Sequence, residues 1–275
     1  MNILVLTDFS VNAKNALYFA LDLALESNAN VKILNCVSAP PSKSNVVVSI
    51  MDILKEDSEK GLNELQNDIK NHKEYSTLKL EMLSSVGELS STVEEISSQW
   101  NIDFIVMGTK GMTALEEIFI GSNTTKMISE VELPLLAIPM DCKYSSIKEI
   151  TFAADLVELK SKEILAPLKL IASSFVDTIQ LFHVYGNKEN QLESEKRKEL
   201  EEIKSYLSPL IIKEVFADHS KSSQELADFS SINKNDLLAM VSRKHGFFKR
   251  LFSTSNTETV ALKTAIPLLV LPERN

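Results

Sequence analysis

The sequence predicts an α/β fold that is built twice within one chain. We expect two tandem open parallel five-stranded sheets flanked by helices and packed as an intramolecular pseudo-dimer. Three observations carry this prediction. Apolar strand-like runs alternate with helical patterns, which is typical of βαβ units and a parallel sheet. The same order of elements occurs twice. The last apolar run of each copy is flanked by proline at both ends and needs a cover for its edge.

The size of the chain agrees with two domains. Its 275 residues correspond to about two domains of average length. A hydrophobic content of 44% and a charged content of 24% are ordinary for a globular protein, so each copy can bury its own core. We expect one domain over residues 1–142 and another over residues 147–275, joined by a short linker near 141–146.

The elements of the first copy follow from local patterns. An apolar run at 3–6 predicts the first strand. Ser10, two residues after Asp8, can cap a helix whose apolar positions fall on one face, namely Ala13, Leu17, Ala20, Leu21 and Ala24. Further strands are predicted near 31–37, 77–83, 103–107 and 135–139, and further helices near 47–72, 88–99 and 123–131.

The second copy repeats this order. Residues 2–8 correspond to 149–155 at an offset of 147, which places Asp155 opposite Asp8, and 31–37 correspond to 178–184 at the same offset. Further along, the offset falls to 133, where 135–139 meets 268–272. We expect the two closing strands, 135–139 and 268–271, to lie side by side in the pseudo-dimer.

Charge and composition argue against several classes of binding partner. Residues 1–142 carry 10 Lys and Arg against 20 Asp and Glu, whereas residues 143–275 carry 19 against 18. An acidic first half argues against nucleic acid as a partner. No apolar stretch approaches the roughly 18 residues of a membrane span, so we expect no membrane partner and a cytoplasmic location. Two cysteines and four scattered histidines predict no metal site.

A glycine pattern is the most specific motif. Gly108, Gly111, Gly121 and Ser122 have the spacing Gly-x2-Gly-x9-Gly-Ser and follow the apolar run 104–107, which reads as a buried strand. Glycine is needed where backbone approaches a ligand or adopts positive φ, and the amides of such a turn favour anions. The spacing matches neither the Walker A loop nor the dinucleotide fingerprint.

The last glycine of the motif, Gly121, precedes the start of a predicted helix. Ser122, Asn123 and Thr124 follow Gly121, so the free N-terminal amides and the hydroxyls can hold phosphate oxygens. The second copy lacks this cradle, because Val241, Lys244 and Thr254 stand at the three glycine positions. Its basic and aromatic segment 243–252 is predicted to be a solvated flap whose phenylalanines pack on the sheet. The alternative is a docking site for an anionic partner or for the acidic first half of another chain.

Together these residues support a family resemblance. Asp8 after the first strand, Met107 with the glycine motif, and a final apolar strand resemble the universal stress protein (UspA-like) family in its tandem two-domain form. The resemblance covers nearly the whole chain. It implies a five-stranded parallel fold of the adenine nucleotide alpha-hydrolase-like, or HUP, type that binds ATP or AMP. The residues that it assigns to the nucleotide are Thr7, Asp8, Val37, Met107, Gly108, Lys110, Gly111, Gly121, Ser122, Asn123 and Thr124.

The sequence is compatible with three functions. The favoured hypothesis is a sensing or regulatory module of the stress response, whose partners are an adenine nucleotide and other copies of the chain. The alternatives are a slow ATPase that uses the same pocket and a nucleotide-independent interaction scaffold. Only Asp8 and Lys110 lie near the pocket as reactive groups, so no catalytic residue is assigned. Asp8 can hold Mg2+ through ATP, or cap the helix beside Ser10.

Overall fold

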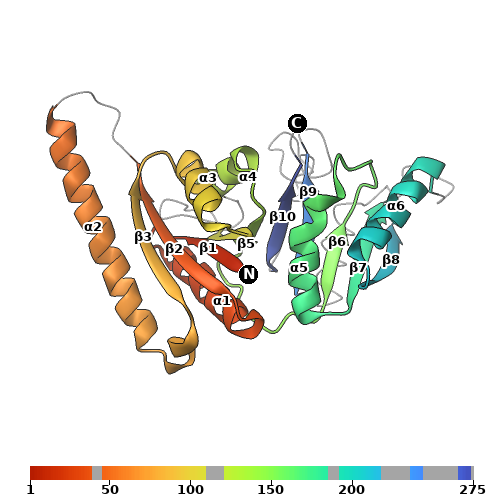
Figure 1. Cartoon of the computed structure of the whole chain (residues 1–275), viewed down its shortest axis with the longest axis horizontal. Helices are drawn as coiled ribbons and strands as arrows, with labels where there is room; N and C mark the ends of the chain where they lie inside the picture. The colour runs from red at the N-terminus through yellow and green to blue at the C-terminus, as the bar shows by residue number, and fades with distance from the viewer. Residues whose placement is uncertain (39–44, 110–120, 185–191, 218–235, 244–265, 274–275) are drawn as a thin grey trace. The chain divides into compact units, whose positions relative to one another are not determined.

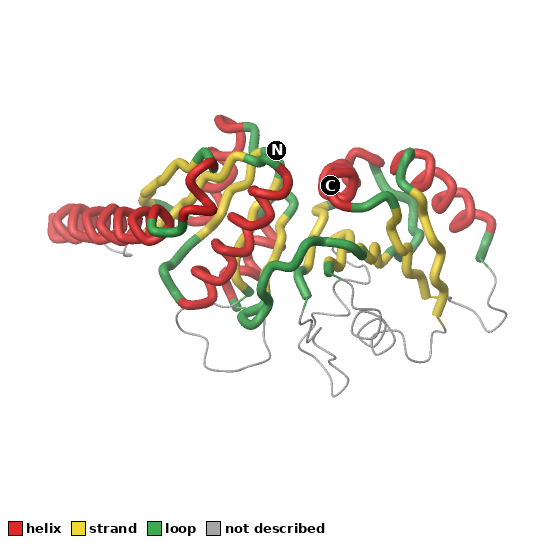
Figure 2. The backbone as a smooth tube through the Cα atoms, turned by 90° about the horizontal axis from the view of Figure 1, so that it is seen from below, coloured by secondary structure: helices red, strands yellow, loops and turns green. Residues whose placement is uncertain are grey.

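The structure is a computed structural model that describes residues 1–38, 45–109, 121–184, 192–217, 236–243 and 266–273, with backbone alone at 45–49, 184 and 217. The chain divides into two compact units, Met1–Leu133 and Pro134–Asn275. In both units the strands are flanked by helices, as Figure 2 shows. The fold is therefore of the α/β class predicted from the sequence.

The first unit holds a parallel sheet with the strand order β3-β2-β1-β4 (Figure 1). Its central strand, β1, pairs with β2 and with β4, so the carboxyl ends of these three strands are neighbours. The elements are β1 (Asn2–Leu6), α1 (Val11–Ser27), β2 (Asn30–Val37), α2 (Asn45–Lys70), η1 (Lys73–Thr77), β3 (Leu80–Val86), α3 (Leu89–Trp100), β4 (Phe104–Gly108) and α4 (Ser122–Glu130).

Helix α1 forms where the sequence predicts it. The Ser10 side chain accepts a hydrogen bond from the backbone N–H of Ala13 at 3.1 Å, which satisfies one of the first amides of the helix. The helix ends at Asn28, whose φ of 54° is the left-handed conformation common after a helix. The predicted apolar face is buried, with Ala13 at 5% exposure and Leu17, Ala20, Leu21 and Ala24 at 0%.

The second unit holds the strands in the order β5-β10-β9-β6-β7-β8. All neighbours in it are parallel except β5 and β10. The elements are β5 (Leu135–Ile138), β6 (Ile150–Ala153), η2 (Lys162–Leu165), α5 (Ala166–Phe175), β7 (Thr178–Val184), α6 (Ser194–Leu207), β8 (Ile211–Ala217), β9 (Leu237–Ser242) and β10 (Leu268–Pro272).

The predicted pairing of the two closing strands is observed. Strand β5 runs antiparallel to β10, with Ala137 opposite Leu268 and Leu136 opposite Leu269. The observed division of the chain differs from the predicted one. The sequence places the boundary after this strand, in the linker near 141–146, whereas the compact units divide before it, at Pro134, which leaves β5 in the same unit as β10.

The alignment of the two copies needs one correction. The sequence aligns residues 31–37 with 178–184 at the offset of 147. In the structure, Val31 lies opposite Ile3 and Ile179 lies opposite Ile150, so the second strand of the second copy comes one residue later. A slip of one residue exchanges the two faces of a strand. The counterpart of Asn35 is therefore His183.

Two element boundaries also differ from the prediction. Strand β3 begins at Leu80 rather than near 77, because Lys73–Thr77 form the 3-10 helix η1. In η1, Tyr75 is buried and its hydroxyl donates to Asp22 Oδ1 at 2.9 Å. In the second copy, the first helical turns, η2 and α5, begin well after the position that corresponds to the start of α1.

None of the helices in the described part of the chain combines the length and apolar character that a membrane crossing requires.

Candidate functional site

The turn after β1 holds Asp8 in place. The backbone N–H of Thr7 donates to Leu34 O at 2.9 Å, and Thr7 Oγ1 accepts from the N–H of Phe9 at 3.0 Å. Asp8 Oδ1 accepts from the N–H of Ser10 at 3.0 Å. Phe9 has a φ of 63°, which costs a bulky residue about 1–2 kcal/mol. These bonds fix the Asp8 carboxylate at the carboxyl end of β1, beside the start of α1.

The second copy repeats this turn. Asp155 Oδ1 accepts from the N–H of Val157 at 3.2 Å, and Leu156 has a φ of 53°. The carbonyl that precedes the aspartate is bound in both copies, since Asn35 Nδ2 donates to Thr7 O at 2.7 Å and His183 Nδ1 donates to Ala154 O at 2.8 Å. The turn and its aspartate therefore belong to the fold, which supports the capping role considered for Asp8.

The start of α4 is fastened to the end of β4. Thr124 is 1% exposed, and its hydroxyl donates to Gly108 O at 3.0 Å. The N–H of Gly121 donates to Thr109 O at 2.6 Å. Ser122 and the residue after it are exposed. The positive end of the α4 dipole and its first N–H groups are thus held at the carboxyl end of β4, an arrangement that favours anions.

The two described motif glycines have different roles. A Cβ added to Gly108 would lie 2.7 Å from Asn12 Nδ2, 2.8 Å from Asn12 Cγ and 3.0 Å from Asn12 O, so the close approach of α1 requires glycine there. Gly121 is the N-cap residue of α4, with φ −63° and ψ 157°. Any residue adopts this backbone conformation, so the conformation of Gly121 does not explain its lack of a side chain.

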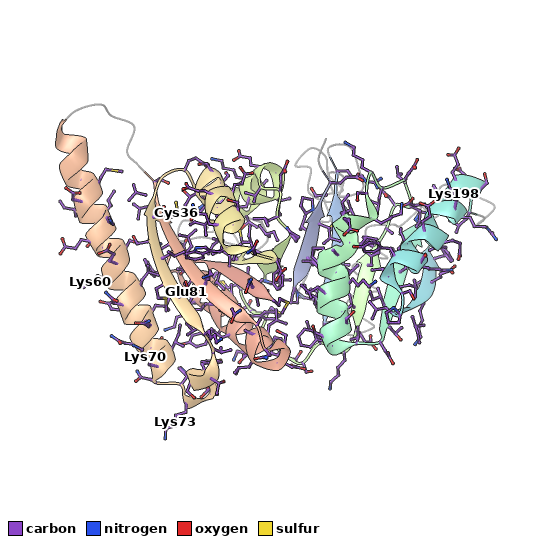
Figure 3. The ribbon with its side chains drawn as sticks, viewed as in Figure 1. Cys36, Lys60, Lys70, Lys73, Glu81 and Lys198 are labelled. Carbon is purple, nitrogen blue, oxygen red and sulfur yellow. The ribbon has the colours of Figure 1, made fainter. Side chains whose placement is uncertain are left out.

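The other predicted residues divide into three groups. Met107 is 7% exposed and belongs to the core. The carbonyl of Val37 accepts from the N–H of Gly87 at 3.0 Å. Figure 3 shows the neighbouring Cys36 near the carboxyl end of β2. Lys110 and Gly111 lie outside the described residues. The structure thus brings four features together at the carboxyl ends of the strands: the turn after β1, the end of β2, the end of β4 and the start of α4.

The sequence reasoning missed an ion pair that fixes α4. Lys126 Nζ lies 2.6 Å from Glu88 Oε1, and Glu88 caps α3 by accepting from the N–H of Ser91 at 2.9 Å. These contacts, with Lys126 first, lower the pKa of Glu88 to about 2. Glutamate is not among the usual N-cap residues, so the capping role of Glu88 could not be predicted from the sequence. The ion pair with Lys126 on α4 could not be predicted either, because Glu88 and Lys126 lie far apart in the sequence.

The ion pair predicts a pH dependence. The folded pKa of Glu88 is lowered, so its stabilising contribution is present above the unfolded pKa of about 4.3 and is lost as pH falls toward about 2. We expect Glu88→Gln to lower the urea midpoint at pH 7 and to leave it unchanged below about pH 2. An equal difference between the two proteins at both pH values would contradict this assignment.

A groove lies between α1 and α2. It has a volume of about 640 Å3, and its lining includes Thr7, Phe9, Lys14, Gly61 and Asp68. A Cβ at Gly61 would lie 2.7 Å from Phe9 Cζ, so the ring packs directly on the helix backbone. Lys14 Nζ pairs with Asp68 Oδ2 at 2.5 Å across the groove. Within the described residues, no three His, Cys, Asp or Glu side chains come together as a metal cluster.

Comparisons with known proteins agree with this arrangement. The model of the universal stress protein family matches residues 1–139 and 162–272. The chain is 25% identical to a universal stress protein of Synechocystis sp. over 148 residues, which are 50% of this chain and 96% of that protein. It is 28% identical to one of Methanocaldococcus jannaschii over 141 residues, 50% of this chain and 80% of that protein. A universal stress protein structure from Archaeoglobus fulgidus superposes with a TM-score of 0.74, at 17% identity, over 99% of this chain and 98% of that one.

Proposed function

Because the chain belongs to the universal stress protein family, we propose that its first domain, residues 1–142, binds an adenine nucleotide, ATP or AMP. The bound nucleotide acts as a sensing or regulatory signal in the stress response. One observation carries the proposal: the N-terminus of α4 is fastened beside the end of β4 by the Thr124 hydroxyl and capped by Gly121, which has no side chain.

The parts of the nucleotide fit the parts of the site. The phosphates meet the first N–H groups of α4 and the exposed side chains of Ser122 and Asn123. The adenine and ribose lie toward Asp8 and the end of β2 at Val37. The resemblance adds Lys110 and Gly111 to the phosphate end. With ATP, the Asp8 carboxylate supplies the oxygen ligand that Mg2+ prefers, together with the phosphate oxygens.

Binding of this kind regulates without catalysis. A ligand that binds one folded state stabilises that state by mass action, in proportion to its concentration relative to its Kd. Homodimer formation is one assembly that such a ligand can favour. Among the described residues assigned to the nucleotide there is no histidine, and Asp8 is the one carboxylate, so we assign no general base.

Calorimetric titration with ATP and with AMP tests the proposal. We expect Gly121→Val to weaken binding by about tenfold or more, because a branched side chain at the helix start blocks the approach of phosphate to the first amides. Ser129→Ala is the matched control, since Ser129 is exposed in the last turn of the same helix. Its affinity should equal that of the wild type.

The same proteins separate the alternatives. Steady production of ADP from ATP that disappears in Asp8→Ala would favour the ATPase. Failure of the wild-type protein to bind either nucleotide would leave the interaction scaffold. Equal affinity of the wild type and Gly121→Val would show that the α4 N-terminus is not the phosphate site.

A further inference from the structure

The second unit contains a largely buried arginine at the carboxyl ends of its strands, the position that corresponds to the candidate site. Arg243 directly follows β9. Its Nη1 lies 3.3 Å from Asp155 Oδ1, after β6, and its buried Nε lies 2.6 Å from Glu273 Oε2, after β10, in an ion pair that lacks hydrogen-bond geometry. Its Nη2 donates to the carbonyl oxygen of Val157 at 2.9 Å. One guanidinium thus joins the ends of three adjacent strands.

This group is shielded from water. The side chains of Arg243, Asp155 and Glu273 are 12%, 25% and 8% exposed. A shielded guanidinium is tolerated when carboxylates and carbonyls pair with its rigid fork of donors. Glu273 is itself held, because its Oε1 accepts from the N–H of Lys160 at 2.9 Å. The cation therefore lies inside a network that the second unit supplies.

The network lies at the position that corresponds to the proposed nucleotide site of the first copy. Asp155 is the counterpart of Asp8, and the two turns share the same hydrogen bond and the same positive φ. The counterpart of Glu273 at the offset of 133 is Met140, so the first copy has no acid at this place in its sequence. A cavity beside Asp155, lined also by Ala154 and Val241, has a volume of about 10 Å3, enough for about one water molecule. A larger groove of about 560 Å3, which shares Leu156 and Val157 with this cavity, is lined by carboxylates such as Glu193, Glu199 and Glu202, which disfavour a phosphate.

We infer that the strand-end site of the second copy is a guanidinium-binding site whose occupant is Arg243 of the same chain. The site is filled from within, so it admits no nucleotide, and its carboxylates recognise a planar cation instead of a phosphate. The inference goes beyond the proposed function, since it concerns a different site and holds whether or not the first copy binds nucleotide.

The occupied state is measurable in the wild-type chain by nuclear magnetic resonance. We expect the Nε–H proton of Arg243, assigned by its loss in Arg243→Lys, to exchange slowly with solvent and to keep its chemical shift when ATP is added to saturation. Exchange as fast as that of the exposed Arg197 would overturn the inference. A large shift of the same signal on addition of ATP to Gly121→Val would also overturn it.

Chemical rescue tests recognition of the cation. Arg243→Ala should lower the thermal midpoint by several degrees relative to Arg197→Ala, the control at an exposed arginine. Free guanidinium ion at about 10 mM, far below denaturing concentrations, should restore at least half of that loss. Sodium chloride at the same concentration should not. Equal effects of the two salts would overturn the inference. The resonance experiment does not depend on the folding of this variant.

Discussion

Gly108→Ala is expected to destabilise the first unit by about 1–3 kcal/mol, the usual cost of inserting a methyl group into a packed site. The added Cβ would lie 2.7 Å from Asn12 Nδ2 and 3.0 Å from Asn12 O. Asn12 is 2% exposed in the first turn of α1, so it has little room to move. Urea unfolding followed by circular dichroism measures the loss.

The matched experiment is Asn12→Ala combined with Gly108→Ala. Two of the three close contacts are made by side-chain atoms of Asn12, and the third is made by its carbonyl. The double variant should therefore recover part of the loss, and the two substitutions should not be additive. If Gly108→Ala alone is as stable as the wild type, the close approach of α1 does not explain the glycine.

The two copies differ at the position of Gly108, and the structure gives a reason for this difference. The sequence suggests that the fold needs none of the three glycines, because Val241 stands in place of Gly108 in the second copy. In the structure, the second copy starts its first helix later, at η2 and α5. At the offset of 147, Leu159 corresponds to Asn12, and Leu159 and Val241 line the same small cavity, so the second copy does not repeat the helix contact that Gly108 makes. Gly108 is therefore explained by packing, whereas neither packing nor backbone conformation explains the lack of a side chain at Gly121.

Thr124→Val should cost about 1–3 kcal/mol in unfolding free energy. Valine has nearly the same shape as threonine but cannot donate, so the buried carbonyl of Gly108 loses the hydroxyl that donates to it. The same change frees the start of α4 from the end of β4. We therefore also expect weaker nucleotide binding in calorimetric titration, although the valine side chain itself remains buried.

Thr124→Ser is the control for this effect. Serine keeps the hydroxyl and loses only a methyl group, so it should retain most of the nucleotide affinity even if some stability is lost. Should Thr124→Val bind nucleotide as well as Thr124→Ser, the hydrogen bond to Gly108 would not position the helix start for the ligand.

Local signals predicted much of the fold. Ser10 and the apolar face of α1 lie within one stretch of sequence, so the cap and the buried residues could be read directly. The pairing of β5 with β10 was predictable because prolines flank both closing strands and both are strongly apolar. The early start assigned to β3 was wrong, because nothing in the local pattern distinguishes the 3-10 helix η1 from an extended segment.

Features that depend on distant residues were not predictable. The register of β7 brings His183 to Ala154 O, just as the register of β2 brings Asn35 to Thr7 O, and neither bond is visible in a linear alignment. The position of Arg243 depends on three separate strand ends. In the sequence it reads as the first residue of a solvated basic flap, whereas the structure pairs it within the second unit.

The number of nucleotides bound per chain tests the account most directly. Native mass spectrometry of the gently purified wild-type protein, with ATP or AMP added to saturation, counts them without further assumptions. We predict one adenine nucleotide per wild-type chain, and a lower occupancy of Gly121→Val at the same nucleotide concentration. Two nucleotides per wild-type chain would contradict the occupied site in the second copy, and none would contradict the proposed site in the first.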